Sequence, residues 1–275
     1  MELLFAHTYL LLFGKLAVGG LAALAVPPFT ELERGFYKST AAVYLFCAYA
    51  MAAGDIYLWL AHPERAPVTP VTLATWVAFC VLFTSYFATL YVELPFLRAR
   101  LFPASILCGI AALAVTAAAY VPAGVGAAAV LVFVVPALAG AAIVGAGLTG
   151  MLLGHWYLID TGLDLAPFRS ILVYCRACLV AEVVAVATAA AILAIWPGSV
   201  WDAGFAAAFS PRFVWLILAR LASWGLVALI LRLIRKTLEI PQTMAATGLF
   251  YIAALVIAVG QIAGHWLLFR TGLPL

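Results

Sequence analysis

The feature that most constrains this chain is a succession of apolar runs of about 20 residues, separated by short clusters of proline, glycine and polar residues. A helix of about 20 apolar residues crosses a hydrocarbon core about 30 Å thick. Only 9% of the residues are charged, whereas soluble domains carry roughly a quarter. The chain is therefore predicted to be an all-α, polytopic integral membrane protein: one helical bundle of about eight transmembrane helices.

The breakers divide the sequence into eight predicted spans that form a single transmembrane domain over residues 1–275. The first apolar run, from Leu3 to Phe29, lacks a basic leading region and is long enough to span, so we expect it to persist as a helix. The loops are short, and no soluble catalytic domain is expected in this chain. The predicted spans are 5–27, 39–61, 70–93, 101–121, 125–153, 168–196, 212–232 and 243–268.

The distribution of basic residues predicts the orientation. Loops on one side carry eight of them: Arg34, Lys38, Arg98, Arg100, Arg169, Arg232, Arg235 and Lys236. The other side carries three: Arg65, Arg212 and Arg270. Because basic loops stay in the cytoplasm, both termini are predicted to lie outside, in the inner (cytoplasmic) membrane of a bacterium or archaeon. The net charge of +3 is thereby a topology signal, and membrane lipid rather than nucleic acid is the expected partner.

Two segments repeat each other. Gly150–Leu165 and Gly260–Leu275 share nine identities in sixteen positions, including Gly-His-Trp and a final Thr-Gly-Leu. We expect glycine in each Thr-Gly pair to supply the left-handed residue that ends a helix. The copies fall on antiparallel spans, which favours units 70–165 and 166–275 related by inverted topology, as in many transporters. A weaker echo of residues 14–26 in 219–231 favours a parallel duplication instead.

Four ionisable residues lie at membrane depth, where charge is costly and usually paired inside the bundle. The first two spans form a hairpin that would bring Lys15 to Asp55, and Glu182 and Arg220 fall at comparable depths. Two buried ion pairs are therefore predicted. They serve either to lock the helices together or to form a pathway for protons or solute.

The histidines suggest a cofactor site at the outer face. His7 and His265 lie just inside the apolar zone on that side and could ligate one haem b, or could exchange a proton with a quinone. Arg176 could reach the interface, an anionic headgroup or a haem propionate. His62 is expected to be a solvated loop residue, and His155, at the inner face, an interfacial cap.

Phosphate-binding loops, zinc-protease, nucleophile-elbow and haem-attachment motifs are all absent from the sequence. No catalytic residue or metal site is predicted, and Cys175 and Cys178 are interpreted as core residues. Three functions remain open. The chain could be a non-catalytic membrane subunit of an electron-transfer complex that binds quinone, haem b and partner subunits. It could instead be a small-solute or proton-coupled transporter, or a membrane scaffold subunit.

Overall fold

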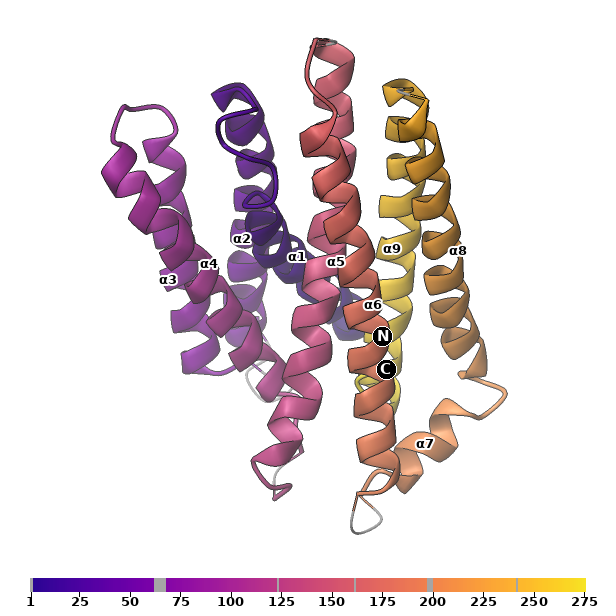
Figure 1. The fold of residues 1–275 in the computed structure, drawn as a ribbon. Helices are drawn as coiled ribbons and strands as arrows, with labels where there is room; N and C mark the ends of the chain where they lie inside the picture. Colours follow the sequence, from indigo (N-terminus) through magenta and orange to yellow (C-terminus); the bar gives the residue numbers. More distant parts are fainter. Residues whose placement is uncertain (1, 62–67, 123, 161, 197–199, 241) are drawn as a thin grey trace.

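The computed structural model describes residues 2–61, 68–122, 124–160, 162–196, 200–240 and 242–275, and all regular structure in these ranges is helical. Eight helices are long and apolar enough to cross a membrane, which confirms the predicted bundle (Figure 1). They are α1 (Glu2–Ala23), α2 (Arg34–Ala61), α3 (Pro70–Thr89), α4 (Pro95–Ala118), α5 (Ala128–Ile159), α6 (Ala166–Ala194), α8 (Val214–Glu239) and α9 (Thr243–Thr271). His62 and Arg65, which are predicted to lie in a loop, are outside the described residues.

The bounds differ from the predicted spans mainly where polar residues continue a helix. α4 begins at Pro95 rather than at residue 101, because proline is well tolerated in the first turn of a helix. α8 continues to Glu239 rather than ending at residue 232, since long basic side chains at a helix end can reach water. The short helix α7 (Asp202–Ala208) was not predicted, and its seven residues are too few to span.

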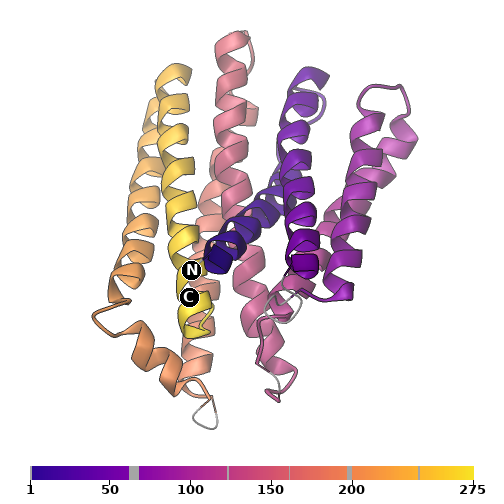
Figure 2. The ribbon, with the colours of Figure 1, turned by 180° about the vertical axis from the view of Figure 1, so that it is seen from behind.

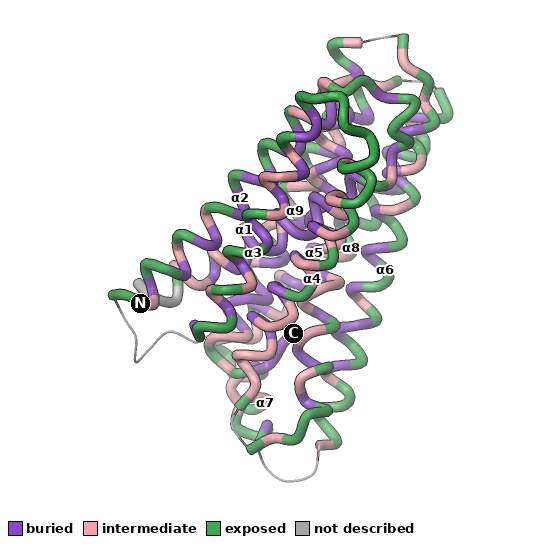
Figure 3. Tube along the Cα trace, turned by 90° about the vertical axis from the view of Figure 1, so that its left-hand side faces the viewer, coloured by how far each residue is buried: buried purple, intermediate pink, exposed green. Residues whose placement is uncertain are grey.

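The helices pack around α5. α5 contacts α1, α4, α6 and α9 and, less extensively, α2, while α3 lies to one side and α8 to the other. α1 crosses the bundle obliquely and contacts α2, α4, α5 and α9 (Figure 2). α7 contacts α9 at the end of the bundle where the C-terminus lies (Figure 1). Buried and exposed residues follow each other along the helices throughout the bundle (Figure 3).

The contact between α1 and α5 is made by backbone. A Cβ at Gly19 would overlap the carbonyl of Ala141, and a Cβ at Gly145 would overlap the backbone of Gly19. Small residues at such positions let two membrane helices approach closely. A hydrogen bond joins α2 to α5: the hydroxyl oxygens of Tyr44 and Thr149 lie 2.6 Å apart. These contacts fix how α1 lies against the centre of the bundle.

The two repeated segments lie on α5 and α9, which run antiparallel. Gly154 of α5 faces Thr247 near the start of α9, whereas Gly264, near the end of α9, faces Arg220 and Leu275. In both copies glycine therefore permits close packing. Gly272 ends α9 with a left-handed φ of 73°, as predicted.

The corresponding prediction for Gly162 was wrong. α5 ends at Ile159 with the extended residue Asp160 as its cap, and the described glycines with positive φ are Gly124 and Gly272. The Asp160 side chain instead accepts a hydrogen bond from the Gly162 amide, as aspartate side chains commonly do with a backbone N–H two residues on in a turn.

Candidate functional site

A network of charged and polar side chains lies in the interior of the bundle, centred on Glu182 of α6. Its carboxylate accepts hydrogen bonds from Arg220 Nη2 at 2.9 Å and from Trp224 Nε1 at 3.1 Å, both on α8. The amide of Gln261 on α9 donates a third. Arg220 also donates from Nη1 to the Gly260 carbonyl at 2.9 Å. Glu182 and Arg220 thus form the buried ion pair that their matched depths predict, with 1% and 5% of their surface exposed.

Lys15 joins this network through Gln261 and not through Asp55. Its Nζ donates to Gln261 Oε1 at 2.8 Å. The predicted ion pair between Lys15 and Asp55 was wrong, because α1 turns this side chain toward α5 and α9 instead of α2. Gly140 of α5 makes room for it, since a Cβ there would lie 2.8 Å from Lys15 Nζ and 2.7 Å from Gln261 Oε1.

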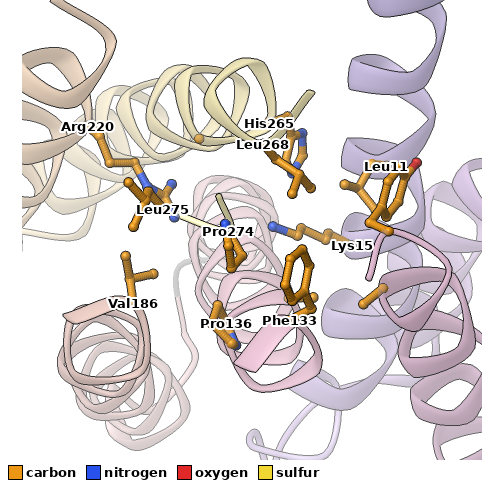
Figure 4. A pocket seen from close by; sticks show the side chains of 14 residues that line it. Leu11, Lys15, Phe133, Pro136, Val186, Arg220, His265, Leu268, Pro274 and Leu275 are labelled. Atoms are coloured by element: carbon orange, nitrogen blue, oxygen red, sulfur yellow. The ribbon is translucent and has the colours of Figure 1, made fainter. Parts of the chain in front are cut away.

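A small cavity opens beside the network. Lys15, Arg220 and His265 contribute the basic groups of its wall, and Leu11, Tyr120, Phe133 and Pro136 are among the other lining residues. Lys15 and Arg220 extend into it from opposite sides (Figure 4). Its volume of about 40 Å³ is enough for roughly three water molecules. The cavity is thus small, lies among several helices and has three basic side chains in a mainly apolar wall.

The side-chain charges around this cavity do not balance. Among the described residues, the ion pair in this network is that of Glu182 with Arg220. Lys15 is 5% exposed and has no ion pair in the same residues. A buried ammonium without a counter-charge attracts an anion or loses its proton, because solvation cannot compensate for its charge. A protonated Lys15 is therefore a positive charge at this cavity that no carboxylate side chain of the described residues pairs with, while the last residue, Leu275, also lines the cavity.

His265 is buried at the edge of this cavity. Its Nδ1 lies 3.2 Å from the Thr8 carbonyl of α1, and its Nε2 is buried with no hydrogen-bond partner in the described residues. The side chain is 3% exposed. Nε2 is therefore a polar atom for which the folded chain supplies no partner, and a ligand or water in the cavity is the natural candidate.

The predicted haem site between His7 and His265 does not fit this geometry. The His7 ring packs on Phe269 at 5.9 Å between centroids, while His265 is held against α1. Ligand pockets have volumes of about 300–1,000 Å³, so a cavity of about 40 Å³ leaves no room for a porphyrin.

The structure separates the remaining candidates. Asp55 is buried on α2 at 4% exposure, with no ion pair among the residues described. Its negative charge, after the larger effect of burial, raises the pKa of the Tyr120 phenol, which lines the cavity. Arg176 is not near the histidines: it lines a groove between α6 and α8. His155 is exposed, with Nδ1 3.4 Å from the Tyr251 hydroxyl.

Three residues of the network were not singled out from the sequence. Gln261 bridges Lys15 and Glu182, Trp224 binds the second carboxylate oxygen, and Gly140 provides the space. An uncharged glutamine in an apolar span is itself a signal, because an amide in hydrocarbon needs a partner. Comparison of the chain with known protein families, curated proteins and solved structures gives no match, so function must be inferred from this cavity.

Proposed function

We propose that this protein transports small anions across the membrane and that the cavity between Lys15, Arg220 and His265 is its substrate site. The observation that carries the proposal is the buried Lys15 ammonium, which has no carboxylate partner among the described residues and borders a cavity. Ionisable groups inside the membrane usually mark a substrate or ion pathway. A protein that needed only a helix lock would be served by Glu182 and Arg220.

The size and chemistry of the cavity define the substrate class. A volume of about 40 Å³ admits a halide or an anion of three or four heavy atoms, such as formate or nitrate. Lys15 and Arg220 supply charge, and His265 Nε2 can donate or accept a hydrogen bond according to its tautomer. The site lies where α1, α5, α8 and α9 meet, and α5 and α9 carry the repeated segments. Transporter substrate sites commonly lie at the interface between repeats.

Replacing Lys15 by methionine should greatly reduce anion transport with little change in fold. A hydrogen bond to a charged group contributes about 1.5–3 kcal/mol, so anion affinity should fall roughly 10- to 100-fold. Uptake of radiolabelled chloride, formate and nitrate into proteoliposomes measures this loss. The control is Lys236→Met, which removes an exposed lysine from the end of α8. Absence of uptake of every anion by the wild-type protein, or undiminished uptake by Lys15→Met, would refute the proposal.

We further propose that Asp55 couples anion transport to protons, because it is a buried carboxylate without an ion pair in the described residues. An acidic exterior should accelerate uptake by the wild-type protein. Asp55→Asn should lose this acceleration while retaining exchange of an anion for the same anion at equal pH. Asp202→Asn, an exposed residue of α7, is the control. A response to the pH gradient that survives in Asp55→Asn would exclude the coupling.

A second candidate is the quinone-binding subunit of an electron-transfer complex. An apolar groove of about 590 Å³ runs between α5 and α6 and shares Pro136 with the cavity. A quinone tail could occupy the groove and place a ring oxygen near His265. The test is co-purification from native membranes, with extraction of bound quinone and a visible spectrum. Partner subunits that co-purify with the wild-type protein, and bound quinone that is lost in His265→Ala, would favour this function.

The proposed orientation gives the side of the membrane that is nearer to Asp55. With the basic loops in the cytoplasm, both termini lie outside the inner membrane of a bacterium or archaeon, and Asp55 is about 9 Å from the outer end of α2. A protease site added after Leu275 and cleaved in intact spheroplasts would establish this side. Protection of that site until the cells are lysed would reverse the orientation.

A further inference from the structure

A second feature that the proposed function does not use is a groove on the outside of the bundle between α6 and α8. It has a volume of about 1,010 Å³. Arg176 of α6 and Arg232 and Arg235 of α8 line it, together with apolar residues that include Val173, Val180, Val184 and Leu231. No acidic residue is among its lining residues. The groove is therefore basic and apolar at once.

The depth of its arginines is unusual for exposed side chains. Arg176 is ten residues, or about 15 Å, from the start of α6, and Arg232 is seven residues, or about 10 Å, from the end of α8. Both are exposed on the surface of helices long enough to span a membrane. A guanidinium that faces lipid at this depth is costly unless it is paired or reaches the headgroups.

The described residues do not supply enough partners for these charges. Arg235 pairs with Glu239 at 3.4 Å, and this is an exposed pair within one turn of α8. Neither Arg176 nor Arg232 has an ion pair among the described residues. Two guanidinium groups are thus left at the basic end of the groove, where they could bind one phosphate.

We propose that this groove binds an anionic phospholipid, with its phosphate at Arg176, Arg232 and Arg235 and an acyl chain along α6. Charge complementarity selects the headgroup, since arginine forms bidentate hydrogen bonds with phosphate. The walls select lipid over free phosphate. Ala181 and Val184 line both this groove and the apolar groove between α5 and α6, so the apolar surface continues beyond the arginines. Basic pockets between membrane helices on the cytoplasmic side bind anionic headgroups in this way.

Native mass spectrometry of the purified protein tests the proposal, with phosphatidylglycerol, phosphatidylcholine and inorganic phosphate titrated separately. We expect phosphatidylglycerol to remain bound after detergent removal, and phosphatidylcholine and inorganic phosphate to dissociate. The double variant Arg176→Gln, Arg232→Gln should weaken phosphatidylglycerol binding by about tenfold or more, because two charge-assisted contacts are lost. The variant leaves the side chains that line the central cavity unchanged.

The matched control is Arg34→Gln, Arg100→Gln, which removes two exposed arginines that are predicted on the same side and lie outside the groove. Retained binding in this control supports a localised lipid site. An equal loss in the control would show a general effect of charge and overturn the proposal. Equal retention of both lipids, or tight binding of inorganic phosphate alone, would overturn it as well.

Discussion

Replacing Glu182 by glutamine is expected to lower the free energy of unfolding by about 3–5 kcal/mol, as when one partner of a buried ion pair is removed. The carboxylate accepts hydrogen bonds from Arg220, Trp224 and Gln261, whereas a glutamine has one acceptor oxygen. Arg220 would then keep its charge inside the membrane with no carboxylate to balance it. Thermal unfolding of the purified protein in detergent, followed by cysteine reactivity, measures the loss.

Two comparisons separate this effect from a general loss of charge. Glu239→Gln removes the carboxylate of the Arg235 pair, whose side chains are both 62% exposed, and should change stability by less than about 1 kcal/mol. The double variant Glu182→Gln, Arg220→Gln should be more stable than Glu182→Gln alone, because the guanidinium that lost its carboxylate is removed as well. If Glu182→Gln unfolded at the wild-type temperature, Glu182 would not be the counter-charge that the geometry indicates.

The helices were predictable because the membrane imposes one strong rule. Every backbone group in hydrocarbon must be bonded within its own segment, so apolar length and the breakers between the runs located eight spans, although the start of α4 at Pro95 was placed six residues too late. The same rule explains the omission of α7. Its seven residues need not cross the bilayer, and neither their length nor their composition distinguishes them from a loop.

The site was only half predictable, because depth can be read from the sequence and rotation cannot. Counting residues from the helix ends placed Glu182 opposite Arg220, and they pair. The same count failed for Lys15, since its partner depends on which way α1 faces. In helices that are apolar on all sides, no amphipathic stripe indicates that direction. It is set by contacts such as Gly19 on Ala141, which become visible only in three dimensions.

Those backbone contacts lead to the second large effect. The substitution Gly19→Ala should destabilise the bundle by about 3 kcal/mol or more, the upper end of the usual cost of overpacking. An added Cβ would overlap the Ala141 carbonyl, and no side-chain rotation can relieve a clash with backbone. Gly145→Ala should act in the same way from α5. Thermal unfolding and the yield of monodisperse protein report the loss.

The chain contains its own controls for this substitution. Gly225 on α8 and Gly248 on α9 are also helical glycines, and a Cβ at either would meet nothing within 4 Å. Alanine there should leave stability unchanged or raise it by roughly 0.5–1 kcal/mol, because glycine is the poorer helix former. The four glycine-to-alanine substitutions each add one methyl group, so differences in their effect on stability would reflect whether that methyl group meets a neighbouring helix. If Gly19→Ala behaved like Gly225→Ala, α1 would not be seated on α5, and Lys15 would lose the contact between helices that holds it beside the cavity.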